Sequence, residues 1–313
     1  MWQTLRQSAA HSRPRAILKR SMPQLITTDV PRFWQAFEHL DAPDAIDHFQ
    51  RFYLDAGTPG VQAFIPERIV SAESLVTAVR ARRAYYASIR ERSLATLSDL
   101  GPRLDAVLAR LPEVVPGAPT HDVYFVIGAM NSGGTLSRGE AGTFAIIGLE
   151  FFCAGPGAIT DDLNPWERAV IRTPDALPSI VAHELVHTLQ PVPQNAEPTL
   201  LLHCLAEGAA EYVGELISGE VINPSLHEYG LTHELTLRAR FQRDMTAGVG
   251  PEHWLYQGNR AVGEPADLGY FIGAQIMRAY HGRYRDRPDV MHDLLHRALL
   301  EPRAFARKSG YFS

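Results

Sequence analysis

Hydrophobic residues recur at helical spacing through the first part of the chain, from about residue 30 to 112, as around Leu75. Proline and glycine at 58–60 and 101–102 interrupt this pattern, which predicts breaks between helices. The charged positions between the apolar ones are typical of solvated helix faces. The pattern therefore predicts a helical N-terminal subdomain over residues 29–115.

The hydrophobic period changes after a proline-rich linker at residues 112–120. β-Branched and aromatic residues dominate 122–128 and again 143–152, which predicts two strands of a small sheet. Between them, the glycine pair in the loop 131–135 is able to cradle a ligand. Because the loop matches no phosphate-binding spacing, a plain turn is the preferred interpretation.

Helical periodicity returns for the rest of the chain. The whole pattern predicts an α+β fold that is mostly helical, in which residues 116–313 form one domain of sheet and helices. The predicted helices of this part cover about 176–190, 199–218, 227–247, 267–282 and 287–299.

Composition narrows the classes of protein to consider. With 313 residues, of which 45% are hydrophobic, the chain can bury a substantial core. A formal charge of −5 offers no general attraction for nucleic acid, so none is expected as a partner. No apolar run approaches the roughly 18 residues of a membrane span, and no such span is expected.

The first 28 residues are basic and contain no acidic residue before Asp29. They lack the continuous apolar segment of a secretory signal, so residues 1–28 are interpreted as a flexible basic arm and the protein is expected to be cytoplasmic. An organellar transit peptide is the alternative. Two cysteines, Cys153 and Cys204, are too few for a disulfide framework, although one bridge between them stays open.

The segment from His183 to His187 reads His-Glu-Leu-Val-His, and a helix there would place both histidines on one face. Val181 and Leu185 would fall toward the other side and anchor the helix in the core. The two imidazoles could then bind one metal ion. Glu184 would lie beside the metal without binding it, where a general base takes a proton from water.

A catalytic zinc ion typically has three protein ligands and one open position. Glu207 is the candidate third ligand, because it lies on a second predicted helix with Leu205 and Val213 as core contacts. Gly208 beside it would permit close approach of another helix. Glu211, four residues on, would share the face of Glu207 and accept a hydrogen bond from a ligand histidine, fixing its tautomer.

The motif alone is not decisive, because a chain with 13 histidines contains a chance HExxH with a probability on the order of a few per cent. The alternative is two histidines and a glutamate on a solvated helix face. An apolar backing stripe and a second helix with paired carboxylates argue against it. The sequence therefore predicts a Zn²⁺ site formed by His183, His187 and Glu207.

The spacing of HExxH and a following Glu-Gly-x-Ala-Glu-Tyr run resembles the gluzincin metallopeptidases over roughly residues 176–216. The resemblance implies a zincin-like fold, a peptide or protein substrate and Glu207 as the third zinc ligand. It also implies that Glu211 supports the first histidine, although thermolysin-like enzymes have aspartate there. The chain lacks the Gly-x-Met-Glu-Asn signature of the aminopeptidase branch, so aminopeptidase specificity is not expected.

A second resemblance is closer and includes the run Pro-Ala-Asp-Leu-Gly-Tyr-Phe-Ile-Gly at 265–273. Together with the two motifs above, this run is similar to a family of predicted bacterial zinc-dependent proteases long catalogued as a domain of unknown function. The likeness extends over most of the chain from about residue 28. It implies the same peptidase activity.

Hydrolysis of an amide also requires a donor to the oxyanion, and Tyr270 is the candidate, between two glycines early in a predicted helix. A tyrosine packed in the core is the competing interpretation. By analogy with gluzincins, residues near Gly148 to Glu150 are candidates to bind substrate backbone, against an ordinary core strand. The weaker candidates for the oxyanion donor are Tyr212, His203, His233 and His253.

The sequence thus predicts a zinc-dependent peptidase in which Glu184 is the general base. A non-catalytic scaffold or binding protein on a metallopeptidase fold is the first alternative, and an intact Glu184 argues against it. A zinc hydrolase of another amide or an ester is the second, because the same groups would serve any acyl transfer.

Overall fold

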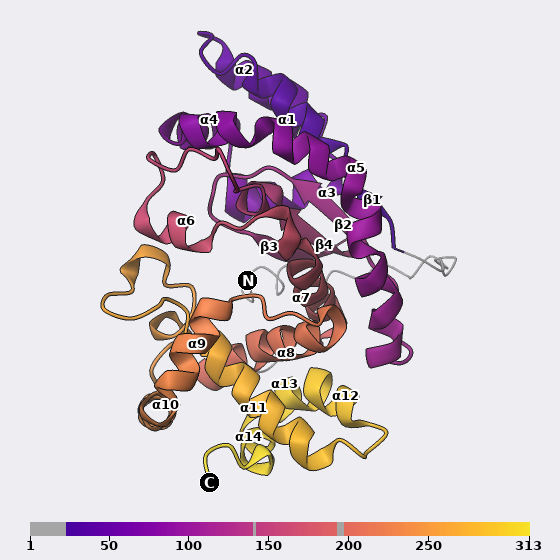
Figure 1. Cartoon of the computed structure of the whole chain (residues 1–313), viewed down its shortest axis with the longest axis vertical. Helices are drawn as coiled ribbons and strands as arrows, with labels where there is room; N and C mark the ends of the chain where they lie inside the picture. Colours follow the sequence, from indigo (N-terminus) through magenta and orange to yellow (C-terminus); the bar gives the residue numbers. More distant parts are fainter. Residues whose placement is uncertain (1–22, 140–141, 193–196) are drawn as a thin grey trace. The chain divides into compact units, whose positions relative to one another are not determined.

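The computed structural model describes residues 23–139, 142–192 and 197–313, which form a small sheet and many helices (Figure 1). In chain order the strands are β1 (Leu25–Ile26), β2 (Asp122–Val126), β3 (Gly134–Gly139) and β4 (Gly142–Gly148). The helices before the sheet are α1 (Asp29–Phe37), α2 (Ala45–Phe49), α3 (Pro59–Phe64), α4 (Ala72–Ala81) and α5 (Arg83–Val114). Those after it are α6 (Pro165–Val170), α7 (Leu177–Leu189), α8 (Leu200–Ser218), α9 (Pro224–Thr232), α10 (Glu234–Ala247), α11 (Gly269–Tyr284), α12 (Val290–His292), α13 (Ala298–Leu300) and α14 (Pro302–Ser309).

The sheet confirms the predicted class of a mostly helical α+β fold. Its four described strands lie in the order β1-β2-β4-β3, with β1, β2 and β4 parallel and β3 antiparallel to β4. Strand β4 is therefore central, and its residues Phe144–Gly148 are buried. The turn predicted at 131–135 is wrong in its last residues, because Gly134 and Thr135 begin β3 by pairing with Ile147 and Ile146. Hydrophobic periodicity did not predict this strand, because β3 lies at the edge of the sheet and its residues show little alternation of apolar and polar side chains.

The predicted basic arm, residues 1–28, is only in part within the described residues, since 1–22 lie outside them. Its last residues are not an arm. Leu25 and Ile26 form β1 and pair in parallel with Val123 and Tyr124. The backbone N–H of Gln24 donates to the Asp122 carboxylate at 2.8 Å. The chain therefore enters the sheet before the first helix.

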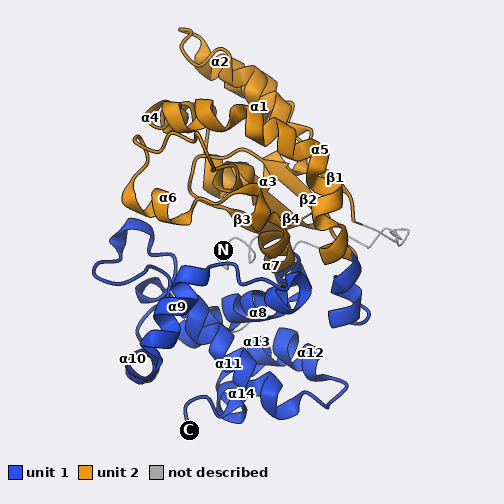
Figure 2. Cartoon of the chain, in the orientation of Figure 1, with its two compact units in different colours: residues 1–12, 109–119, 185–313 blue, residues 13–108, 120–184 orange. Residues whose placement is uncertain are grey.

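Contacts within the chain divide the described residues into two compact units (Figure 2). Unit 1 contains 109–119 and 185–313, and unit 2 contains the described residues before 109 together with 120–184. The sheet lies in unit 2 together with the N-terminal helices, and the predicted domain 116–313 stays a prediction. The division falls inside α7, after Glu184. Whether residues 29–115 fold as a subdomain stays a prediction.

Tyrosines in the aromatic core of unit 2 donate hydrogen bonds to backbone carbonyls just after two of the parallel strands. Tyr53 and Tyr86 donate hydrogen bonds to the carbonyls of Ile127 and Gly128, which follow β2. Tyr85 donates to the carbonyl of Glu150, which follows β4. These buried hydroxyl groups give hydrogen-bond partners to backbone carbonyls that lie beyond the paired residues of the strands. The carboxyl ends of β2 and β4 are therefore held in fixed positions.

Helix α5 runs through the break that Gly101 and Pro102 predicted. The missing N–H of a helical proline costs about 3 kcal/mol. Leu100, Leu104 and Leu108 nevertheless keep helical spacing across this point, and all three are buried. Burial of each such side chain contributes about 2 kcal/mol, so the apolar stripe outweighs the proline. At 58–60, by contrast, Pro59 begins α3 as predicted.

Unit 1 is built on two helices, α8 and α11, that approach closely at glycines. A β-carbon on Gly208 would lie 2.1 Å from the carbonyl carbon of Gly273, and one on Gly273 would lie 1.8 Å from the oxygen of Cys204. No residue other than glycine fits either position without moving a backbone. The close approach predicted for Gly208 is confirmed. It fixes α8, which carries Glu207, against α11.

Candidate metal centre

Helix α7 is buried all round, which differs from the amphipathic helix expected from its sequence. Every side chain from Val181 to Gln190 is buried, including both histidines. A helix that is mostly apolar on all faces belongs in an interior, so the polar residues within it need partners. The helix ends at Leu189, and Pro191 soon after cannot continue its hydrogen bonding.

His183 and His187 lie one turn apart on α7 and form a group with Glu207 of α8. One ligand atom from each of the three residues lies within 4.8 Å of the other two, and all three residues are buried. Two imidazoles and a carboxylate at this separation could hold a divalent metal ion. The structure therefore brings together the three residues that the sequence predicted as metal ligands.

Gln190, which the sequence analysis did not consider, orients His187. The side-chain nitrogen of Gln190 donates to the carbonyl of Ala206 at 2.8 Å, so its oxygen faces the ring. That oxygen lies 2.9 Å from Nδ1 of His187. This arrangement assigns the imidazole proton to Nδ1, because an amide oxygen can only accept. In the neutral ring, Nε2 of His187 then carries the lone pair that can bind a metal ion, whereas in the charged ring Nε2 donates to Glu207.

The Nε2 side of the His187 ring faces the Glu207 carboxylate. Nε2 lies 3.1 Å from Oε2 of Glu207, inside the protein. Two acceptor atoms repel at this distance unless a proton or a metal ion is shared between them. The Oε1 atom of Glu207 accepts a hydrogen bond from the Tyr256 hydroxyl at 2.8 Å. A buried imidazole lone pair beside a buried carboxylate fits a bound cation.

Glu184 lies on α7 next to His183 and is buried. Its carboxylate packs against the backbone of β3, since a β-carbon on Gly134 would lie 2.3 Å from Oε1 of Glu184. Only glycine leaves room for the carboxylate in this position. The glycine pair that the sequence analysis assigned to a plain turn thus contributes one member, Gly134, to the surroundings of the candidate base.

Glu211 is buried one turn after Glu207 on α8. It accepts a hydrogen bond from the side-chain nitrogen of Asn223 at 3.4 Å. Nε2 of His227 lies 3.9 Å from the same carboxylate oxygen. Its predicted support of a ligand histidine stays a prediction.

Tyr270 lies in the first turn of α11 and is half-buried. Its backbone N–H donates to the carbonyl of Asp267 at 3.0 Å. Its role as oxyanion donor stays a prediction. The hydroxyl of Tyr256, from the loop before α11, contacts the candidate ligand Glu207. Burial raises the pKa of this hydroxyl well above its usual value, with the Glu207 carboxylate adding to the effect, so Tyr256 remains a donor.

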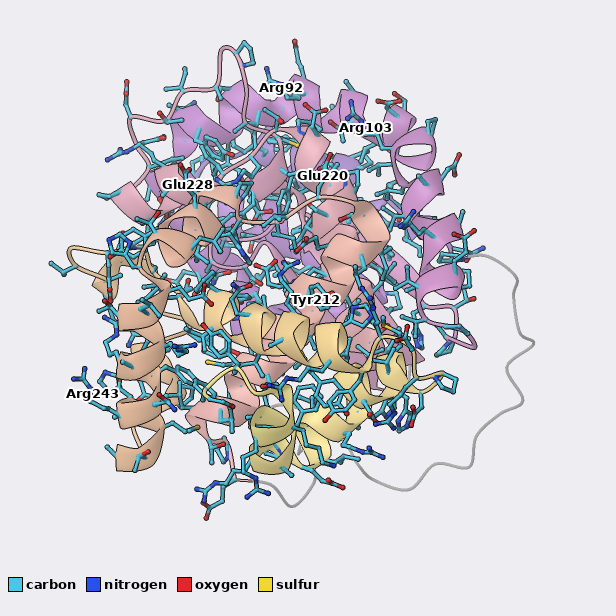
Figure 3. The ribbon with its side chains drawn as sticks, turned by 60° about the horizontal axis from the view of Figure 1, so that its bottom comes forward. Arg92, Arg103, Tyr212, Glu220, Glu228 and Arg243 are labelled. Atoms are coloured by element: carbon cyan, nitrogen blue, oxygen red, sulfur yellow. The ribbon has the colours of Figure 1, made fainter. Side chains whose placement is uncertain are left out.

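The weaker candidates for an oxyanion donor occupy different positions. Nδ1 of His203 lies 3.4 Å from the Tyr256 hydroxyl, and burial lowers the pKa of His203. Figure 3 labels Tyr212, which lies on α8 and has its hydroxyl 2.6 Å from Nδ1 of His281 on α11. His233 and His253 are both exposed.

The segment Gly148 to Glu150 does not offer an edge for a substrate. Gly148 ends the central strand β4, and Glu150 is fully buried in the 3₁₀ turn that follows. Burial raises the pKa of the Glu150 carboxyl to about 7, and backbone N–H groups of Gly128 and Met130 offset part of this effect. Strand β4 is not at the edge of the sheet, so the edge strand predicted for 143–152 is wrong. The edge on this side of the sheet is β3.

Three residues at the site were missed by the sequence analysis, and they differ in how well the sequence signals them. Gln190 follows His187 by three residues and could have been found from helical spacing. Gly134 belongs to a glycine pair, which signals an unusual backbone without saying what lies against it. Tyr256 has no local signal, because only the fold brings it to Glu207.

No protein-family model, curated protein or solved structure matches this chain. Among the helices that the structure describes, none is both long and apolar enough to cross a bilayer. The candidate site therefore has to be judged on its own residues.

Proposed function

We propose that this protein is a zinc-dependent peptidase of zincin-like fold, in which His183, His187 and Glu207 hold the metal. The observation that carries the proposal is the buried approach of Nε2 of His187 to Oε2 of Glu207, 3.1 Å apart, with His183 in the same group and Nδ1 of His187 facing Gln190. Two nitrogen ligands and one oxygen ligand are a donor set that zinc hydrolases use. When bound, zinc lowers the pKa of water and polarises a carbonyl.

The chain's own residues then perform the proton transfers. Glu184 takes a proton from the attacking water and delivers it to the nitrogen of the leaving amine. Gly134 leaves the space in which the Glu184 carboxylate lies. Gln190 keeps the Nε2 lone pair of His187 directed at the metal position. The negative charge that develops on the carbonyl oxygen requires a further hydrogen-bond donor, for which Tyr270 remains a candidate.

A peptide is the favoured substrate because of the strand next to Glu184. In the described sheet β3 pairs only with β4, so its other side is an edge. An extended peptide can add to such an edge through main-chain hydrogen bonds. Gly134, at the start of β3, is the residue that touches Glu184. A backbone bound along β3 would therefore run toward the candidate general base.

The test combines metal analysis of the purified protein with digestion of a peptide library. We expect one zinc ion per chain, cleavage of a subset of peptides, and loss of bound zinc in His183→Ala. Glu184→Gln should retain zinc and lower turnover by at least about 100-fold, the usual contribution of a general base. Glu150→Gln is a matched control, since it removes another buried carboxylate and should retain cleavage.

Other results would select a different function. Zinc without cleavage of any peptide would favour a binding protein, and cleavage confined to ester or non-peptide amide substrates would favour the other hydrolase. Undiminished hydrolysis by Glu184→Gln would remove Glu184 from the reaction.

A further inference from the structure

Tyr256 adopts a backbone conformation that aromatic residues rarely adopt. Its φ is +59°, in the left-handed region, and only three other described non-glycine residues have a positive φ. A β-carbon is disfavoured there, and such strain persists only where the surroundings enforce it. The contacts around Tyr256 therefore need to explain why the chain keeps a tyrosine at this position.

Those contacts form a bridge across the base of a surface loop. The backbone N–H of Gln257 donates to the Asp267 carboxylate at 2.8 Å, and the backbone N–H of Asp267 donates to the Gln257 side chain at 2.9 Å. Asp267 also has a positive φ, of 68°. Arg260 donates to the carbonyl of Tyr256 at 2.6 Å. Residues 257–267 are thus closed into a loop, and Tyr256 lies at its neck.

The bridge directs the Tyr256 hydroxyl at Glu207. The hydroxyl donates to Oε1 at 2.8 Å, and the ring contacts His203 edge-on, with centroids 6.0 Å apart. The other carboxylate oxygen, Oε2, faces His187. Each oxygen of Glu207 therefore has a different neighbour, and rotation of the carboxylate would break the hydrogen bond to Tyr256.

We propose that Tyr256 is a positioning residue for the metal ligand Glu207, holding Oε1 so that Oε2 alone is presented to the metal. This inference rests on the proposed metal site. An unrestrained carboxylate can rotate or offer both oxygens, whereas a donor on one oxygen selects a single-oxygen ligand. Partners of this kind, which contact the ligand and not the metal, typically change metal affinity 10- to 100-fold. The backbone strain at Tyr256 is retained because a relaxed backbone would move the Tyr256 hydroxyl away from Glu207.

The experiment measures zinc affinity by competition with a chromophoric chelator on the full chain. Tyr256→Phe keeps the ring and the backbone conformation and removes only the hydroxyl. We expect its zinc dissociation constant to rise roughly 10- to 100-fold. Tyr280→Phe is the matched control, because its hydroxyl donates to another buried carboxylate, Asp293, at 2.6 Å. It should leave zinc affinity within about twofold of wild type.

A second pair of variants tests the bridge. Asp267→Ala removes the acceptor for Gln257 and should weaken zinc binding in the same direction as Tyr256→Phe, whereas Asp267→Asn keeps an acceptor and should restore affinity. The melting temperature of each metal-free variant separates a change in ligation from a loss of fold. Wild-type affinity in a folded Tyr256→Phe protein would overturn the role of Tyr256. Absence of zinc binding by the wild-type chain would instead overturn the proposed metal site.

Discussion

Glu150 and Glu207 are both buried glutamates, but their surroundings differ. Glu207, on α8, faces Nε2 of His187 with one oxygen and the hydroxyl of Tyr256 with the other. Glu150, after β4, has no side-chain hydrogen-bond partner for its carboxyl among the described residues. Burial raises the pKa of Glu150 to about 7. The surroundings of Glu150 therefore favour a neutral acid, whereas Glu207 has a polar neighbour at each of its carboxylate oxygens.

Burial by itself does not distinguish Glu207 from Glu150. Burial alone disfavours the charged form of any carboxyl group. What distinguishes Glu207 is a convergent set of polar groups, none of which is its neighbour in sequence. A metal ligand needs such a set, because an isolated buried carboxylate would rather take up a proton.

Glu207→Gln and Glu150→Gln make the same chemical change in the two surroundings. We expect Glu207→Gln to weaken zinc binding by more than about 100-fold, beyond the usual effect of losing a residue that only supports a ligand. Glu150→Gln should bind zinc like wild type. Equilibrium dialysis with zinc analysis measures both. Equal affinities of the two variants would remove the distinction between these glutamates.

Glu150 should also make stability depend on pH. Because its pKa is raised from 4.5 in the unfolded chain to about 7 in the folded one, its contribution is fully present below pH 4.5 and is lost as pH rises through 7. The two values correspond to roughly 3 kcal/mol. In the metal-free protein, the free energy of unfolding of wild type should fall by about this amount relative to Glu150→Gln between pH 4.5 and 8.

Urea denaturation at several pH values measures this difference. Parallel pH profiles for wild type and Glu150→Gln would show that the group does not titrate between the two states.

Gly134→Ala should disturb the candidate base without removing the metal. A β-carbon there would displace the Glu184 carboxylate, which lies 2.3 Å from its position. Misplacement of a reacting group by about 1 Å can lower turnover on the order of 100-fold. Gly139→Ala, at the other end of β3, has open space for a methyl group and is the control. Peptide hydrolysis and bound zinc are measured for both variants, and equal turnover would contradict the contact.

Gln190 should have the smallest effect of the four. Gln190→Leu removes the acceptor for Nδ1 of His187 and should weaken zinc binding about 10-fold. Gln190→Glu keeps an acceptor and should retain most of the affinity. Chelator competition distinguishes the two. If the leucine variant binds zinc as tightly as wild type, the orientation of His187 does not depend on Gln190.

Much of the fold was predictable from local pattern, and the exceptions have physical causes. The strands predicted at 122–128 and 143–152 correspond to β2 and β4, although β4 ends at Gly148 and a 3₁₀ turn follows it. The helices around His183 and Glu207 were also predicted, because buried helices carry strong apolar patterns. The break at Pro102 was wrong, because the buried stripe of α5 outweighs the local preference of proline. Strand β3 was missed, because an edge strand is stabilised by its partner and not by its own composition.

The sequence by itself determined the chemical types at the candidate site. The i, i+4 spacing of His183 and His187, with Glu184 between them, follows from the geometry of one helix, and Glu207 was a candidate because a catalytic metal needs a third ligand.

Only the tertiary structure decided which groups surround those residues. Tyr256 reaches Glu207 across 49 positions in the chain, and Gly134 of strand β3 reaches Glu184 of helix α7. Such neighbours depend on loop closure and on strand order, which leave no periodic trace in the sequence. A helix motif can therefore specify metal ligands, whereas the partners that hold those ligands are specified by the packing of distant segments.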